Sequence, residues 1–169
     1  PGYDPGHAYS SANGGPVPLA RPDLAFSNAE ARELMKQRLR YVVARWGAFR
    51  SVLAWELINE LTFVGTEAAN PYNDAQLRAD LVDWHADLAS YLKSIDPFGH
   101  LVTTSQAIDD TASAELQELN AVWALPAIDL VQIHAYEPPA ALTTRIRDMI
   151  DDFAARYGKP VLVGEIGLP

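Results

Sequence analysis

The sequence predicts an α/β fold in which about four parallel strands alternate with helices, as in an incomplete portion of a (β/α)8 TIM barrel. Short apolar runs, typical of strands buried on both faces, alternate with longer segments whose apolar residues recur at helical spacing. Residues with carboxylate, amide, hydroxyl or imidazole side chains lie at the carboxyl end of each such run. An open doubly wound sheet would give the same alternation, but the placement of the polar residues favours a barrel, whose strands end at one active-site mouth.

The composition is typical of a single well-buried domain. The 169 residues are 49% hydrophobic and carry a formal net charge of −9. We expect no nucleic-acid partner, because no basic cluster with interleaved aromatic residues is present, and no membrane partner, because no apolar run approaches the roughly 20 residues of a membrane span. The absence of cysteine excludes disulfides, thiolate metal sites and cysteine nucleophiles, but it leaves the compartment open.

The first 26 residues predict a long loop. They are rich in Gly, Pro, Asn and Ser, and Asn13-Gly14-Gly15-Pro16 is their strongest turn signal. Loops of this length in compact domains tend to be functional or disordered. Because Pro1 opens the chain without a methionine or a signal-peptide pattern, we expect a segment from the middle of a longer protein. We therefore treat 1–169 as one domain, with a loop over 1–26 and βα units over 27–169.

The first βα elements follow this loop. Ser27-Asn28-Ala29-Glu30 has the spacing of a capping box and predicts a helix over about 28–46. The apolar run 51–58 predicts a buried strand, which Asn59 and Glu60 terminate.

The remaining elements continue the alternation. A helix is predicted over 74–94, and Asp96-Pro97-Phe98-Gly99 ends it. The later elements, in chain order, are a short strand over 100–105, a weaker helical stretch over 112–123, a strand over 129–134, a helix over 140–157 and a strand over 160–164.

Two glutamates at strand ends predict the chemistry. Glu60 and Glu165 are 105 residues apart, which equals three βα units of about 35 residues, so they should lie at one level and meet across the mouth. Two carboxyl groups about 5–5.5 Å apart are what a retaining glycosidase needs, one as acid/base and one as nucleophile. Either glutamate could instead be structural, but their places after apolar strands favour catalysis. For Glu56, on the same face as Glu60, we favour a structural role.

Other polar and aromatic residues are candidates for binding substrate. His134 and Tyr136 share one face of a strand near the mouth, and Ser105 ends another strand at the same level. Phe63 and Tyr72 follow Glu60 in a loop and could stack on a sugar ring.

No metal and no cofactor are expected. His7, His85 and His100 lie in a loop, on a helix and before a strand, so they do not form a zinc triad. The chain also lacks the glycine patterns of nucleotide-binding loops, which makes a doubly wound binding domain a remote alternative.

Four motifs resemble the cellulase-like glycoside hydrolases of clan A, near family 5. The resemblance covers most of the chain and implies that Asn59 contacts the sugar 2-hydroxyl, that Glu60 is the acid/base and that Glu165 is the nucleophile. It implies as well that His134 and Tyr136 orient the substrate and donate a hydrogen bond to the nucleophile. The motifs, in chain order, are Arg40-Tyr41-Val42-Val43-Ala44-Arg45-Trp46-Gly47, Trp55-Glu56-Leu57-Ile58-Asn59-Glu60, Val131-Gln132-Ile133-His134-Ala135-Tyr136 and Lys159-Pro160-Val161-Leu162-Val163-Gly164-Glu165.

The chain departs from this family in its length. A complete barrel of the family has three strands before residue 52 and one after Gly167, and these strands supply an arginine, a histidine and a tryptophan that have no counterpart here. We expect two exposed strand edges, which could pair with the missing part of the barrel or with a second copy of the chain.

The expected function is hydrolysis of a β-linked poly- or oligosaccharide with retention, in a parent protein that is secreted or periplasmic. The alternative is a non-catalytic carbohydrate-binding or assembly fragment of such a barrel. The motifs do not distinguish glucan, mannan, xylan or a small glycoside, nor endo from exo action.

Overall fold

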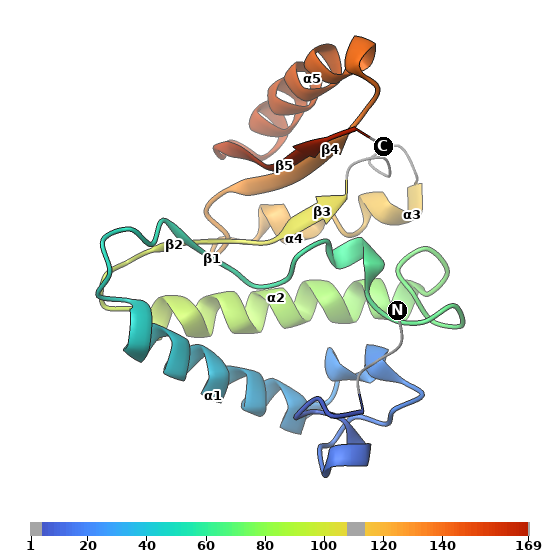
Figure 1. The fold of residues 1–169 in the computed structure, drawn as a ribbon, viewed down its shortest axis with the longest axis vertical. Coiled ribbons are helices and arrows are strands. Elements are labelled where there is room, and N and C mark those ends of the chain that lie inside the picture. Colours follow the sequence, from blue (N-terminus) through green and yellow to red (C-terminus); the bar gives the residue numbers. More distant parts are fainter. Residues whose placement is uncertain (1–4, 108–113, 169) are drawn as a thin grey trace.

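The computed structural model describes residues 5–107 and 114–168 and has a mixed α/β fold with parallel strands (Figure 1). Three long helices alternate with the strands, and shorter helical turns lie in the connections. The long helices are α1 (Ala29–Trp46), α2 (Ala75–Ile95) and α5 (Pro139–Tyr157). The strands are β1 (Ala54–Glu56), β2 (Leu101–Thr103), β3 (Ser105–Ala107), β4 (Val131–Tyr136) and β5 (Val161–Gly167). The short elements are η1 (Ser11–Asn13), η2 (Pro22–Ala25), η3 (Leu61–Phe63), α3 (Ala114–Gln117) and α4 (Ala121–Ala124).

The strands form two small parallel sheets that adjoin at one residue. β1 pairs with β2, and β3, β4 and β5 pair in that order. Thr104 alone separates β2 from β3, and the N–H of Ser105 donates to the carbonyl of Ile58 beyond β1 at 3.2 Å. The strand predicted over 100–105 is therefore divided into the two short strands β2 and β3. The four predicted strands are neighbours in the order of the sequence, and all of their pairings are parallel.

The helix boundaries follow their caps. The side chain of Asn28 accepts the N–H of Ala31 at 3.0 Å and starts α1, and Asp74 accepts the N–H of Leu77 at 3.1 Å and starts α2. These caps lie where the sequence placed both helix starts, to within one residue. α5 ends at Gly158, whose φ of 63° favours glycine because it lacks a Cβ.

Two predicted elements differ from the structure. The strand expected over 51–58 is limited to Ala54–Glu56, because the N–H of Val52 closes a turn onto the carbonyl of Phe49 instead of pairing in the sheet. The helical stretch expected over 112–123 consists of the short helices α3 and α4, and its first two residues lie outside the described part of the chain. Among the described residues, no helix is both long and apolar enough to cross a membrane.

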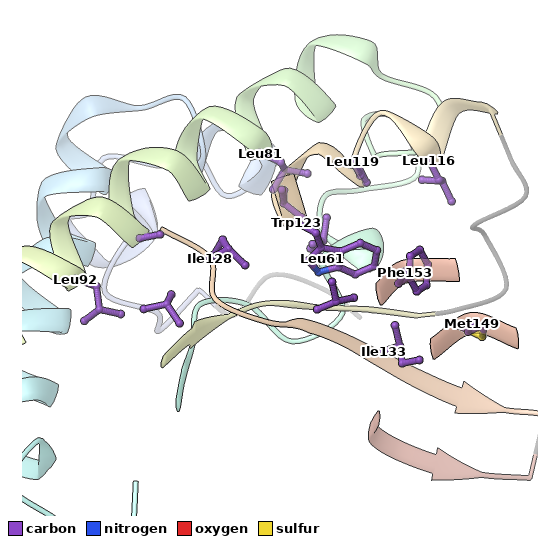
Figure 2. Close-up of a cluster of buried hydrophobic side chains, with 14 of the residues drawn as sticks. Leu61, Leu81, Leu92, Leu116, Leu119, Trp123, Ile128, Ile133, Met149 and Phe153 are labelled. Carbon is purple, nitrogen blue, oxygen red and sulfur yellow. The ribbon is translucent and has the colours of Figure 1, made fainter. Parts of the chain in front are cut away.

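The core lies between the strands and the helices that cover one of their faces (Figure 2). Trp123 of α4 is fully buried and meets Phe153 of α5 edge to face, with ring centroids 5.0 Å apart. Leu81 of α2 and Ile133 of β4 belong to the same cluster. Each such side chain stabilises the fold by about 1.5–3 kcal/mol. α1 and α2 pack together at one end of the molecule, and α5 covers β4 and β5 at the other (Figure 1).

A β-bulge in β5 decides which way Glu165 faces. Ile133 pairs with Val163 and His134 pairs with Glu165, so Gly164 is an extra residue between two ladder positions. A Cβ at Gly164 would lie 2.9 Å from the side-chain nitrogen of Gln132, so only glycine fits without displacing that side chain. Because of the bulge, Glu165 shares the face of β4 that carries His134, the face opposite the hydrophobic core.

Candidate active site

The polar residues singled out from the sequence lie at or near the carboxyl ends of the strands. Asn59 and Glu60 follow β1, and Ser105, the first residue of β3, comes two residues after the end of β2. His134 lies on β4, with Glu165 beside it on β5. Because the strands are parallel, their carboxyl ends bring these residues to one edge of the molecule.

Glu60, His134 and Glu165 form the centre of this site. Nδ1 of His134 lies 2.9 Å from Oε1 of Glu60 and 3.6 Å from Oε2 of Glu165. One oxygen of each glutamate and the imidazole nitrogen all lie within 4.8 Å of one another. The imidazole is buried, whereas the side chains of Glu60 and Glu165 are 23% and 39% exposed. The two carboxylates therefore face solvent across a buried histidine.

Tyr136 holds the second carboxylate. Its hydroxyl donates to Oε2 of Glu165 at 2.6 Å. This hydrogen bond, with burial and the negative charges of Glu165 and Glu60, raises the pKa of Tyr136 above its ordinary value of 10.0. The phenol therefore stays protonated near neutral pH and remains a hydrogen-bond donor to Glu165.

The backbone of Glu60 is in an unusual conformation. Among residues 5–107 and 114–168, Glu60 is the single non-glycine residue with positive φ, at 52°. This left-handed conformation costs about 1–2 kcal/mol for a residue with a Cβ. Backbone strain of this kind is found preferentially at functional sites. It turns the chain sharply after Asn59, so that the Glu60 side chain meets His134.

Ser105 lies beneath this turn. Its hydroxyl accepts the N–H of Glu60 at 2.8 Å and is 3.4 Å from Oδ1 of Asn59, to which it can donate. The residue is fully buried. This geometry supports a role in positioning Asn59 and Glu60, in place of the substrate contact that the sequence suggested.

His85 and Thr104 support the same turn, and sequence reasoning missed them. Nδ1 of His85 is 2.7 Å from the carbonyl of Leu81, and its Nε2 is 3.0 Å from the hydroxyl of Thr104. That hydroxyl is also 3.0 Å from the carbonyl of Ile58. Burial lowers the pKa of His85 to about 4, so the imidazole is neutral near neutral pH. A histidine on a helix gives no sign in the sequence that it reaches a strand end.

The aromatic candidates lie apart from the carboxylates. Phe63 and Tyr72 are 63% and 41% exposed, and both line a hollow of about 600 Å³ between the loop over 1–26 and the loop after Glu60. Neither Glu60 nor Glu165 lines this hollow. The structure therefore brings Glu60, His134, Tyr136 and Glu165 together, and it places Phe63 and Tyr72 beside them and not among them.

Glu56 lies lower on the face that carries the site. Its Oε1 accepts a hydrogen bond from Nε2 of Gln132 at 2.9 Å, and Gln132 precedes His134 by two residues on β4. This contact ties β1 to β4 across the sheet. The geometry agrees with a structural role for Glu56.

The chain is similar in sequence to known proteins whose names state an enzymatic activity. The chain is 30% identical to mannan endo-1,4-beta-mannosidase 7 of Oryza sativa subsp. japonica over 89% of its own length and 46% of that protein. It is similar to mannan endo-1,4-beta-mannosidases. No family model matches the chain.

Further relatives carry the same kind of name. Mannan endo-1,4-beta-mannosidase 8 of the same plant is 29% identical over 89% of the chain and 46% of the relative. The probable mannan endo-1,4-beta-mannosidase F of Neosartorya fischeri is 25% identical over 85% of the chain and 32% of the relative. The chain thus spans about half the length, or less, of the curated relatives it matches. These names agree with the resemblance to glycoside hydrolases of clan A.

Proposed function

We propose that this chain carries the catalytic centre of a retaining β-glycan hydrolase, with Glu60 as acid/base and Glu165 as nucleophile. The observation that carries the proposal is the proximity of the two carboxylates, since one oxygen of Glu60 and one of Glu165 lie within 4.8 Å of each other. Retaining glycosidases hold their carboxyl groups about 5–5.5 Å apart, whereas inverting enzymes need about 6.5–9.5 Å to admit a water molecule. The spacing supports retention and argues against inversion.

The proposed reaction has two steps. In the first, a carboxylate oxygen of Glu165 attacks the anomeric carbon while Glu60 gives its proton to the glycosidic oxygen, and the bond to the leaving sugar breaks. In the second, Glu60 takes a proton from water as the water oxygen attacks the same carbon and releases Glu165. The sugar is transferred twice, so its configuration is retained.

The neighbouring residues fit these roles. The 2.6 Å hydrogen bond from Tyr136 orients the carboxylate of Glu165. His134 contacts Glu60 at 2.9 Å through Nδ1, which is suited to holding the acid/base in place. Asn59 is exposed beside Glu60, where the family resemblance expects a contact with the sugar 2-hydroxyl. Ser105 and the backbone strain at Glu60 fix the direction of the acid/base.

The proposed substrate is a β-1,4-linked mannan, because the relatives are named for that activity. We place the active centre in a (β/α)8 barrel of which this chain supplies about four strands. The parallel order of β1 to β5 and the position of the site residues at or near the carboxyl ends of these strands support this placement.

Two substitutions test the assignment of roles. Glu165→Gln should abolish hydrolysis of an aryl β-mannoside without unfolding the chain, because the amide cannot attack the anomeric carbon. Glu60→Ala should be slow and should recover activity with azide, which needs no general base in the second step. Full activity in Glu165→Gln would show that Glu165 is not the nucleophile.

The second candidate function is a non-catalytic carbohydrate-binding or assembly fragment. It is favoured by the exposure of Glu165 and by the length of the relatives, which is about twice that of this chain or more. Binding of mannooligosaccharide without turnover of any aryl β-glycoside would support this alternative.

A further inference from the structure

We propose that Glu60, His134 and Glu165 together bind a divalent transition-metal ion such as Zn²⁺, which blocks the site to glycan. The binding of the ion follows from the geometry alone. Competition with glycan rests in addition on the proposed function, since it requires that the same carboxylates contact the substrate.

The three donor atoms are close to the arrangement that zinc requires. Around a tetrahedral zinc ion with ligand bonds of about 2.0–2.2 Å, neighbouring ligand atoms lie roughly 3.3–3.6 Å apart. Nδ1 of His134 is 2.9 Å from Oε1 of Glu60 and 3.6 Å from Oε2 of Glu165. The gap between the two carboxylate oxygens is no more than 4.8 Å. A tetrahedral site therefore requires the Glu60 oxygen to move away from Nδ1 of His134 and the two carboxylate oxygens to approach each other.

The surroundings favour a cation here. His134 is held on β4 and buried, so its Nδ1 is fixed, whereas the two glutamates reach solvent from which an ion can enter. Two carboxylates this close repel each other when both are ionised, and a cation between them removes the repulsion. Tyr136 donates to Glu165 and so supplies the kind of outer contact that orients a metal-bound carboxylate.

The imidazole can take the tautomer that metal binding needs. Nε2 of His134 is buried and has no hydrogen-bond partner among the described residues. Without the ion, Nδ1 shares a proton with Oε1 of Glu60 at 2.9 Å. Binding of the ion displaces that proton, and the ring then carries its single proton on Nε2 while Nδ1 offers its lone pair to the ion.

The donor set selects the type of ion. One imidazole nitrogen and two carboxylate oxygens suit Zn²⁺, which also accepts water in the fourth position. Mg²⁺ requires near-octahedral oxygen coordination, and Ca²⁺ takes 6–8 oxygen ligands, so neither fits three donors of which one is nitrogen. We therefore expect the site to bind Zn²⁺ and to discriminate against Mg²⁺.

Calorimetric titration of the chain with Zn²⁺ alone tests the binding. We expect one saturable site for Zn²⁺ and no detectable site for Mg²⁺. Glu60→Gln, Glu165→Gln and His134→Asn should each weaken Zn²⁺ binding by at least about tenfold. Glu56→Gln is the matched control, because Glu56 lies on the same face but pairs with Gln132 outside the group, and it should leave binding unchanged.

Circular dichroism of each variant separates loss of ligand from loss of fold. The two glutamine variants keep the shape of the side chain, so at least these two should retain the native spectrum. The inference is wrong if folded Glu60→Gln and Glu165→Gln bind Zn²⁺ as strongly as the parent chain does. It is also wrong if binding weakens only in Glu56→Gln.

Steady-state kinetics separates the inference from the proposed function. Zn²⁺ should raise KM for an aryl β-mannoside and leave kcat unchanged, because ion and substrate compete for the same carboxylates. If the chain hydrolyses the glycoside but binds no Zn²⁺, the metal site is wrong and the proposed function stands. If it binds Zn²⁺ through the three residues but hydrolyses no glycoside, the metal site stands and the proposed function fails.

Discussion

The side chain of Ser105 explains how a strained residue keeps its place at the site. Glu60 has φ of 52°, and its N–H is held by the buried hydroxyl of Ser105 at 2.8 Å. A single short hydrogen bond of this kind contributes about 0.5–1.5 kcal/mol to stability. That amount is similar to the strain it offsets, so the direction of the Glu60 side chain should depend on this hydroxyl together with the His85 and Thr104 contacts at the same turn.

Ser105→Ala should lower kcat more than it changes KM. It leaves the N–H of Glu60 without its acceptor, which should cost about 1–3 kcal/mol in the free energy of unfolding. Urea denaturation and steady-state kinetics measure the two effects. Ser94→Ala is the matched control, since Ser94 is exposed on α2 and its hydroxyl only returns to the carbonyl of Tyr91. Equal kinetic effects in the two variants would contradict a positioning role for Ser105.

At the scale of the element, the end of α2 is fixed by a buried carboxylate. Asp96 accepts hydrogen bonds from the Trp55 indole nitrogen at 3.0 Å, from the Phe98 N–H at 3.0 Å and from Nδ1 of His100 at 2.7 Å. Burial alone would raise the pKa of Asp96, but these hydrogen bonds outweigh it and lower the pKa to about 2. The contact with Trp55 joins the end of α2 to β1.

This carboxylate should make the stability of the fold fall in acid. The pKa of Asp96 is about 2 in the folded chain and 3.8 ordinarily, so its contribution is complete above pH of about 5 and is lost as the pH falls through 3.8 towards 2. Urea denaturation at intervals over this range should show the loss. In Asp96→Asn the loss of stability in acid should be smaller. Asp151→Asn, on the exposed face of α5, is the control and should lose as much stability in acid as the parent chain. An Asp96→Asn profile identical to that of the parent chain would show that another group is responsible.

The bulge in β5 is the second element on which the site depends. The sequence predicted a strand ending near Glu165, and alternation alone would have placed Val163 and Glu165 on one face. The register instead puts Val163 with the core and Glu165 with His134, because Gly164 is inserted between them. The bulge arises where Gln132 of β4 packs against Gly164, a contact between strands that local sequence does not encode.

Gly164→Ala should disturb the direction of Glu165. The new Cβ would lie 2.9 Å from Nε2 of Gln132, so β5 or the glutamine must shift, at a cost of about 1–3 kcal/mol. Thermal unfolding and kcat on an aryl β-mannoside should both fall. Adding Gln132→Ala to Gly164→Ala should restore part of the stability, because it removes the obstacle. If the second substitution makes no difference, the contact with Gln132 does not set the bulge.

At the scale of the whole molecule, the sequence predicted which residues meet but not how they are held. Counting βα units placed Glu60 and Glu165 at one level, and the capping-box spacing at Ser27 to Glu30 and the helical spacing over 74–94 placed two helices. The buried supports of Glu60 were not predictable, because His85 reaches its turn from a helix 25 residues further along the chain. Local patterns specify elements, whereas contacts between distant elements specify the exact direction of a side chain.

The open edges of the molecule should promote association. Leu53, before β1, and Ile166, on β5, are 64% and 59% exposed, and these strands lie at opposite ends of the strand order. Unpaired strand edges with apolar residues favour pairing with another chain. Sedimentation velocity at increasing concentration should show self-association, and Ile166→Lys should reduce it. A concentration-independent monomer would contradict this expectation.

The most direct test of the central claim is to trap the glycosyl intermediate. A 2-deoxy-2-fluoro mannosyl fluoride slows both steps of a retaining mechanism, so the sugar should remain bound to the nucleophile. Mass spectrometry of the digested chain should find the added sugar on the peptide that contains Glu165, and Glu165→Gln should prevent the labelling. Labelling of another residue, or turnover of glycoside with inversion and no labelling, would contradict the account.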